Sequence, residues 1–153
     1  TYYFNGDAVM ATGWVTFDGA WHWMTPSGRM ATGWAKVGDT WYYLDPTTGA
    51  MATGWANVDG SWYYLNASGA MATGWVNVNG SWYYLNASGA MATGWTAVNG
   101  SWYYLTGNGA MAIGWVNDGG TWYYLNASGR MVTGWVTIDG TRYHFASSGA
   151  WLG

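Results

Sequence analysis

Residues 74–93 read GWVNVNGSWYYLNASGAMAT, and this stretch returns with small changes along the whole chain. Tryptophan marks the repeat at a step of twenty residues, at positions 55, 75, 95, 115 and 135. Upstream, Trp34 precedes Trp55 by twenty-one residues and Trp14 precedes Trp34 by twenty. A fixed period in this range is typical of an array of stacked units rather than of one mixed core. Fold and function must therefore be derived from one unit and its contact with the next.

The centre of the unit is Asn79-Gly80, which stands between two runs of aromatic and β-branched residues. A two-residue Asn-Gly turn in that setting predicts a type I′ β-hairpin, because both central residues need positive φ. Gly38-Asp39 has glycine first, which suits a type II′ turn. The other units keep the Asn-Gly chemistry at Asp18-Gly19, Asp59-Gly60, Asn99-Gly100, Gly119-Gly120 and Asp139-Gly140. We therefore expect an all-β chain of seven hairpins, starting near residues 14, 34, 55, 75, 95, 115 and 135.

The turn also predicts which side chains share a face of the hairpin. If Asn79 and Gly80 form the loop, Trp75 lies opposite Tyr84, and alternate residues point to opposite faces. Both faces are then apolar, so a lone hairpin would not be stable in water and each needs a neighbour or a ligand. One face is expected to carry Trp75, Asn77, Trp82 and Tyr84, and the other Val76, Val78, Tyr83 and Leu85.

The composition excludes several classes of function. Only 7% of the residues are charged, the formal net charge is −3, and no basic patch is present, which argues against nucleic-acid binding. No apolar run approaches the length that crosses a membrane, so we expect no membrane insertion. The chain has no cysteine, which excludes disulfides and cysteine-based metal sites.

Catalysis also finds little support in the sequence. Most aspartates stand in or beside the predicted turns, where turn formation explains them. His22 and His144 occupy strand positions that hold Tyr in other units, so we interpret them as aromatic replacements, and two lone histidines do not make a zinc site. The serines and threonines repeat with the period and lack a nearby His/Asp constellation. We expect no enzyme activity, no cofactor and no metal.

The aromatic face is the remaining candidate for chemistry. Two Trp and a Tyr without a carboxylate offer electron-rich walls that suit a bulky, weakly hydrated cation such as a quaternary ammonium group. The same rings could instead pack against the next unit or stack on sugars. Spacing alone leaves these three alternatives open.

The pattern GWxxxxGxWYYLxxxGxMxTGW resembles the choline-binding repeat of cell-surface proteins and cell-wall lytic enzymes from pneumococci, related bacteria and their phages. The likeness covers almost the whole chain. It implies an all-β solenoid of hairpins in repeats of about 20 residues, with a choline held between consecutive hairpins. It also implies an extracellular, non-covalent attachment to a Gram-positive cell wall through choline or phosphocholine on teichoic and lipoteichoic acids. The alternative is a glucan-binding repeat array, a looser relative that would use the same rings to stack on polysaccharide.

The resemblance also implies site residues by their position in the repeat. Each site would take two Trp from one hairpin, a Tyr from the next and a Met as its floor. The five sets are Trp14, Trp21, Tyr43 and Met51; Trp34, Trp41, Tyr64 and Met71; Trp55, Trp62, Tyr84 and Met91; Trp75, Trp82, Tyr104 and Met111; and Trp95, Trp102, Tyr124 and Met131.

The ends of the chain depart from this pattern. A sixth set would use Trp115 and Trp122, with His144 in place of the Tyr and Trp151 in place of the Met. Because a protonated His144 would repel a cation, the pattern disfavours this site. Arg142 replaces a wall of the last hairpin, so we expect no site there. We expect residues 1–153 to form a single repeat array whose lead-in strand, residues 1–4, is truncated and continues upstream in a larger parent protein.

Overall fold

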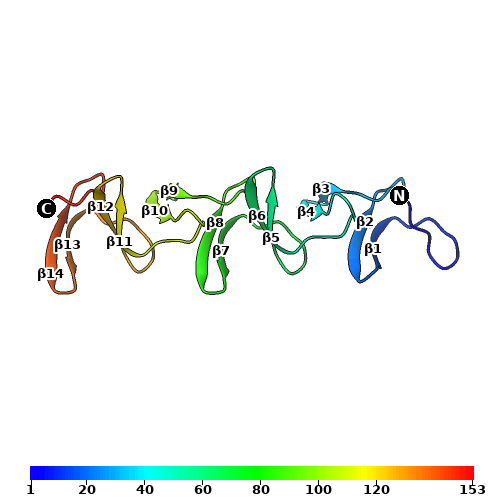
Figure 1. Cartoon of the computed structure of the whole chain (residues 1–153), viewed down its shortest axis with the longest axis horizontal. Helices are drawn as coiled ribbons and strands as arrows, with labels where there is room; N and C mark the ends of the chain where they lie inside the picture. The colour runs from blue at the N-terminus through cyan, green and yellow to red at the C-terminus, as the bar shows by residue number, and fades with distance from the viewer. The chain divides into compact units, whose positions relative to one another are not determined.

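The computed structural model describes all residues, 1–153, and every regular element in it is a β-strand (Figure 1). The strands pair antiparallel in seven separate two-stranded sheets. The hairpins are β1 (Gly13–Phe17) with β2 (Ala20–Met24), β3 (Gly33–Val37) with β4 (Thr40–Leu44), β5 (Gly54–Val58) with β6 (Ser61–Leu65), β7 (Gly74–Val78) with β8 (Ser81–Leu85), β9 (Gly94–Val98) with β10 (Ser101–Leu105), β11 (Gly114–Asp118) with β12 (Thr121–Leu125), and β13 (Gly134–Ile138) with β14 (Thr141–Phe145). The predicted all-β hairpin solenoid is confirmed.

The chain forms two compact units. The first contains Thr1–Thr73 and Ala87–Ala90, and the second contains Gly74–Asn86 and Met91–Gly153. Within each unit, successive hairpins point in different directions along the path of the chain, and the loops between them connect one hairpin to the next (Figure 1). The same repeat runs through both units, and the single array over residues 1–153 stays a prediction.

The turns have the predicted backbone conformations. Asn79 has φ of 51° and Gly80 of 87°, as a type I′ turn requires. Gly38 has φ of 64°, whereas Asp39 is not among the residues with positive φ, in agreement with a type II′ turn. Asparagine and aspartate tolerate this region because their short polar side chains bond locally. The turn residues thus determine the register of each hairpin.

The strand register agrees with the expectation from the turns. Trp75 lies opposite Tyr84, and Val78 lies opposite Ser81. Repeats with altered sequences keep the same offset, including the last hairpin, where Trp135 lies opposite His144. The period of two therefore assigns side chains to faces correctly throughout the array.

Hairpins of one unit are joined by backbone hydrogen bonds from their loops rather than by strand pairing. The Met51 N–H donates to the carbonyl of Trp21 in the preceding hairpin, at 2.8 Å. The next residue, Ala52, donates to the carbonyl of Tyr43 in its own hairpin, also at 2.8 Å. The bond to the preceding hairpin recurs from Met71 to Trp41, Met111 to Trp82, Met131 to Trp102 and Trp151 to Trp122.

The core is a narrow row of side chains, one from the end of each second strand. These residues are at most 1% exposed: Met24, Leu44, Leu65, Leu85, Leu105, Leu125 and Phe145. Each repeat contributes only one fully buried side chain, which makes a small core. The remaining apolar burial must therefore come from aromatic rings at the contacts between hairpins. His22 is also buried at 3% exposure, stacked on Phe17 with ring centroids 3.7 Å apart. The aromatic interpretation of His22 is therefore correct.

The loops are ordered by side-chain hydrogen bonds that the sequence only suggested. The Asn66 Oδ1 accepts the backbone N–H groups of Ser68 and Ala70 at 2.9 and 3.0 Å. In the longer loop after β4, the pKa of Asp45 is lowered because the backbone N–H groups of Thr48 and Thr47 donate to its carboxylate. Turn formation therefore accounts for these asparagine and aspartate residues.

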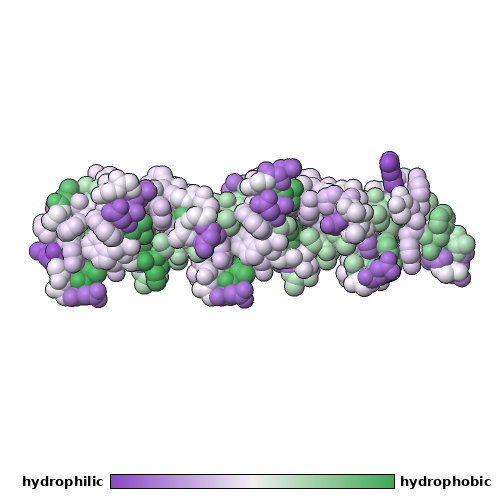
Figure 2. All heavy atoms as spheres, in the orientation of Figure 1, coloured by the Kyte–Doolittle hydropathy of each residue, from purple (hydrophilic) through white to green (hydrophobic).

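Strongly polar residues are sparse on the face drawn in Figure 2, and large apolar side chains are exposed at many positions. Figure 2 shows mostly pale, near-neutral residues, with the strongly hydrophilic ones in small separate areas, several of them at hairpin ends. No helix that could cross a membrane is present.

Replacing Leu105 by Ala tests the row of buried side chains. Leu105 is completely buried, so the change should lower the free energy of unfolding by about 2–5 kcal/mol through lost burial and a cavity. The matched control is Ile113→Ala, at an apolar residue of the same unit that is 61% exposed, and its effect should stay within about 0.5 kcal/mol. Urea denaturation followed by tryptophan fluorescence measures both, and equal effects would show that the row is not the core.

Candidate functional site

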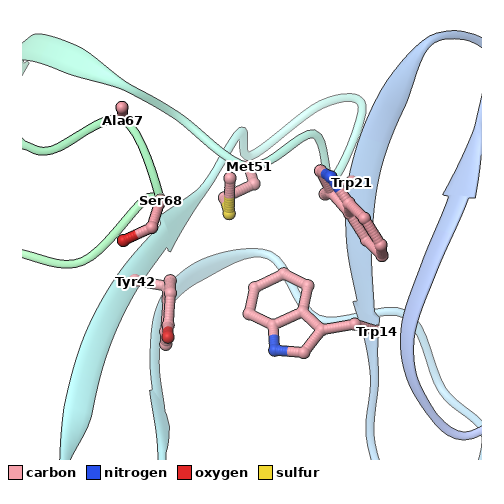
Figure 3. A pocket seen from close by; sticks show the side chains of 6 residues that line it. All are labelled: Trp14, Trp21, Tyr42, Met51, Ala67 and Ser68. Carbon is pink, nitrogen blue, oxygen red and sulfur yellow. The ribbon is translucent and has the colours of Figure 1, made fainter.

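An open pocket of about 320 Å³ lies between the first hairpins (Figure 3). Trp14 from β1 and Trp21 from β2 form two walls, and Tyr42 from β4 forms a third. The rings of Trp14 and Tyr42 meet edge to face, with centroids 4.8 Å apart. The thioether side chain of Met51 lies beside these three rings. Ala67 and Ser68, from the loop after β6, border the pocket at its far side. Three successive repeats therefore contribute to one pocket.

The same pocket recurs in both units. We number the pockets as the predicted sets and call them cages one, two, four and five. Cage one is the pocket just described. Cage two is lined by Trp34, Trp41, Tyr63, Met71, Ala87 and Ser88; cage four by Trp75, Trp82, Tyr103, Met111, Ala127 and Ser128; and cage five by Trp95, Trp102, Tyr123, Met131 and Ser148. Their volumes are about 330, 370 and 190 Å³.

The second-strand Trp is the most accessible wall of each cage. Trp21 is 49% exposed, Trp82 45% and Trp102 47%. The first-strand Trp is partly buried, because its ring packs on the cage Tyr of the next hairpin and on a ring of its own hairpin, which is Trp23 in cage one and a Tyr in the other cages. In cage two the rings of Trp34 and Trp41 stand nearly perpendicular, at 87°. Each cage thus has one fixed wall and one wall open to solvent.

The predicted Tyr is wrong by one residue in each described cage. The cage Tyr is Tyr42 and not Tyr43, and likewise Tyr63, Tyr103 and Tyr123 replace the predicted Tyr64, Tyr104 and Tyr124. Tyr43 lies opposite Trp34 in its own hairpin, with ring centroids 5.0 Å apart, so it shares the face of Trp34. A stacked hairpin turns its other face toward the preceding hairpin, and that face carries Tyr42. Alternation in the sequence places the two Tyr on opposite faces but does not say which face meets the preceding hairpin.

The third predicted set is divided between the two units, with Trp55 and Trp62 in the first and Tyr84 and Met91 in the second. It stays a prediction. By the alternation that applies to the other repeats, its Tyr should be Tyr83.

In the sixth set, the residue that lies against Trp115 is a neutral Tyr and not the predicted His144. Tyr143, not His144, lies against Trp115, with centroids 5.0 Å apart. Trp151 stands 5.9 Å from Trp115 and 6.0 Å from Tyr143, so an indole takes the place of the methionine. His144 instead stacks on Trp135, at 4.2 Å and 4°. The stated reason for disfavouring the sixth set, a charged His144 in the cage, is therefore wrong.

The last hairpin carries a cation of its own. The Arg142 guanidinium lies over the Trp135 ring, 4.7 Å from its centroid. Arg142 stands where other hairpins have the second wall, and Trp135 is 58% exposed. The Trp135 face is therefore covered by a residue of the same hairpin.

The methionine of each cage rests against a glycine of the following loop. An added Cβ at Gly69 would lie 2.3 Å from Met51 Sδ, and the same close approach joins Gly89 to Met71 and Gly129 to Met111. Gly69 also has φ of 83°, a conformation that other residues rarely adopt. Turn geometry alone is thus an incomplete account of these glycines, because they also make room for the methionine.

Two charged side chains touch cage rings, each in one cage of the second unit. Asp118, which ends β11, accepts a hydrogen bond from the indole Nε1 of Trp95 at 2.9 Å. The Arg130 guanidinium Nε donates to the hydroxyl of Tyr103 at 3.4 Å. The expectation that no carboxylate stands near the aromatic face is therefore wrong for cage five.

The cages suit binding rather than bond-breaking chemistry. Their walls are ring faces and a thioether, which attract a weakly hydrated cation or stack on a flat apolar surface. No group of three or more His, Cys, Asp or Glu residues is placed to hold a metal ion. The Ser68 hydroxyl that borders cage one donates to Asn66 within its own loop, at 2.6 Å.

Comparison with known proteins gives a consistent assignment. The family model for the choline-binding repeat matches residues 11–53, 52–93, 72–114, 92–133 and 112–152. Choline-binding protein CbpJ of Streptococcus pneumoniae TIGR4 is 47% identical over 98% of this chain, with a TM-score of 0.95, and 55% of its length is covered. Comparison with curated protein sequences finds no match.

Two structures of choline-binding protein F of Streptococcus pneumoniae are also similar. One, determined in the presence of a peptidoglycan analogue, is 45% identical over 98% of this chain, with a TM-score of 0.92 and 55% of its length covered. The other, in complex with ipratropium, is 43% identical over 98%, with a TM-score of 0.90 and 56% of its length covered. The chain therefore spans little more than half the length of these relatives.

Fold and pockets together define a β-hairpin repeat module with an aromatic-lined pocket between successive hairpins of each unit. The chain belongs to the choline-binding repeat family.

Replacing Gly69 by Ala tests the support of the cage methionine. The variant has both an unfavourable φ and a Cβ against Met51, whereas Gly60→Ala in the same unit has a φ of 84° and open space. Each change should cost about 1–2 kcal/mol of stability from backbone strain, and Gly69→Ala should cost about 1–3 kcal/mol more.

A crystal structure of Gly69→Ala should show the Met51 side chain displaced into cage one. Equal stabilities of the two variants, with Met51 unmoved, would mean that the contact is unimportant.

Proposed function

We propose that this chain is a non-catalytic attachment module that binds the choline of phosphocholine-decorated teichoic and lipoteichoic acids on a bacterial cell wall. The quaternary ammonium group would lie in each cage, between the two Trp, the Tyr and the Met. The module would act outside the cell and would hold whatever protein it belongs to on the wall without a covalent bond.

The observation that carries the proposal is the repeated cage itself. A trimethylammonium group is bulky and weakly hydrated, and the faces of Trp and Tyr attract it through their quadrupoles. Each ring contributes about 0.5–2 kcal/mol, depending on how far the contact is desolvated. Three rings then account for about 4 kcal/mol, which corresponds to a dissociation constant near millimolar.

The similar proteins support the choice of ligand. One structure of choline-binding protein F holds ipratropium, a quaternary ammonium compound, and another was determined with a peptidoglycan analogue. Both structures match over 98% of this chain. This family membership supports a cationic ligand and a location at the wall.

The number of cages explains how weak sites could hold a protein on a wall. Once one choline of a polymer is bound, the next capture is intramolecular, and avidity can exceed single-site affinity by about 10² to 10⁴. Cages one and two in the first unit and four and five in the second repeat the same chemistry. Attachment by many weak, reversible contacts is what such an array would provide.

The proposal is tested by retention on a choline-displaying resin, with elution by free choline. The neutral isostere 3,3-dimethyl-1-butanol has the same shape without the charge, and it should elute the protein far less well if cation–π attraction dominates. Retention on dextran that choline does not reverse would favour the glucan-binding alternative instead. Release of soluble wall fragments by the purified chain would contradict the absence of catalysis.

Replacing Trp82 by Ala should remove binding at cage four. The change deletes the exposed wall, so choline should no longer shift the indole resonance of Trp75, which shares the cage. Cages one and two, in the other unit, should keep their half-saturation concentrations.

The matched control is Trp135→Ala, which removes an exposed Trp that Arg142 already covers. It should leave choline binding unchanged at all the described cages. Unchanged choline binding at Trp75 in the folded Trp82→Ala variant would show that the cage assignment is wrong.

A further inference from the structure

The cages share their ring chemistry, but two of them differ in nearby charge. At the position of Asp118, the other repeats have apolar residues: Phe17, Val37, Val58, Val78, Val98 and Ile138. At the position of Arg130, they have Ala50, Ala70, Ala90, Ala110 and Ala150 in the following loops, apart from Arg29 in the first loop. Only 7% of the chain is charged, so two charges bonded to cage rings are a clear departure from the repeat.

We propose that Arg130 and Asp118 give cages four and five opposite preferences for ligand charge. Cage four favours phosphocholine, whose phosphate can meet the guanidinium, and cage five favours choline without an attached phosphate. The inference rests on the proposed function and concerns the specificity of the same sites.

The preference of cage four follows from the contact of Arg130 with Tyr103. The guanidinium Nε donates to the hydroxyl of Tyr103, which places the positive charge at the polar tip of a cage wall. Ala127 and Ser128, from the loop that ends in Arg130, line the same cage. A bare cation in the cage is repelled by this charge. A phosphate linked to that cation gains a partner with donors in the geometry that phosphate prefers.

The preference of cage five follows from the contact of Asp118 with Trp95. The Asp118 carboxylate accepts a hydrogen bond from the indole N–H of Trp95 at 2.9 Å. Because the acceptor is an anion, it polarises the N–H bond and increases the electron density of the indole ring. The face of Trp95, a wall of cage five, then attracts a cation more strongly. The same negative charge repels a phosphate. Cage five is also the smallest of the described cages, at about 190 Å³, which suits the smaller ligand.

No other charged residue of the second unit has this relation to a cage. Its remaining charged side chains are Asp139, in a hairpin turn, and Arg142, over the Trp135 ring. Both provide internal comparisons, because they carry charge in the same unit without a contact to a described cage. The two preferences are therefore assigned to single residues that can be changed one at a time.

The test is titration of the full chain with choline and with phosphocholine, followed by the indole Nε1–H resonances of Trp82 for cage four and Trp102 for cage five. The quantity compared is the ratio of the choline to the phosphocholine dissociation constant in each cage. Because each exposed charge changes the ratio by about two- to fivefold, and the two charges act in opposite directions, the ratio should be about four- to twenty-five-fold larger for cage four than for cage five.

Variants then assign the difference to the two residues. Arg130→Ala, which restores the residue of the other loops, should lower the ratio of cage four, while Arg130→Lys should largely preserve it. Asp118→Val should raise the ratio of cage five, and Asp118→Asn separates the charge from the hydrogen bond while retaining an acceptor. Arg29→Ala and Asp139→Asn remove the same charges away from the described cages and should change neither ratio.

The outcomes separate this inference from the function on which it rests. Equal ratios in cages four and five, or variants that act no more strongly than their controls, would overturn the opposite preferences while choline binding stands. Failure of choline to shift any cage resonance in the folded protein would overturn the proposed function and this inference with it.

Discussion

The backbone hydrogen bond from the methionine of each described cage to a tryptophan carbonyl of the preceding hairpin is the contact on which the stacking within each unit depends. Strands of different hairpins do not pair, so this 2.8 Å bond is the regular backbone link between neighbours. It fixes where the methionine side chain lies, and the glycine of the following loop gives that side chain room. The position of one N–H group therefore sets the spacing of the hairpins and the floor of each cage.

Stability and binding share the same side chains in this fold. The fully buried core contributes one residue a repeat, so the rings between hairpins must supply much of the remaining packing. The first-strand Trp of each described cage packs against two aromatic rings, while the second-strand Trp stays 40–49% exposed. The cages are the parts of these contacts that packing leaves open, which explains why they recur wherever the repeat recurs.

Residues that depart from the repeat change the charge or the accessible ring faces of individual cages and hairpins. Arg142 covers Trp135, and Trp151 replaces a methionine beside Trp115. Asp118 and Arg130 place opposite charges against the rings of adjacent cages. In a chain with so few charges, each substitution acts in a background of nearly neutral surface, where its field is not masked by neighbours.

The sequence by itself determined the hairpins. Two-residue turns such as Asn79-Gly80 impose positive φ, and the turn then sets the register and the faces. It also indicated the two Trp and the Met of each cage through a family resemblance. Only the tertiary structure showed that Tyr42 rather than Tyr43 meets Trp14, since this depends on which face a hairpin turns toward its neighbour. The contributions of Ser68, Asp118 and Arg130 were likewise decided by tertiary structure, because stacking brings together residues that lie one or more repeats apart in the chain.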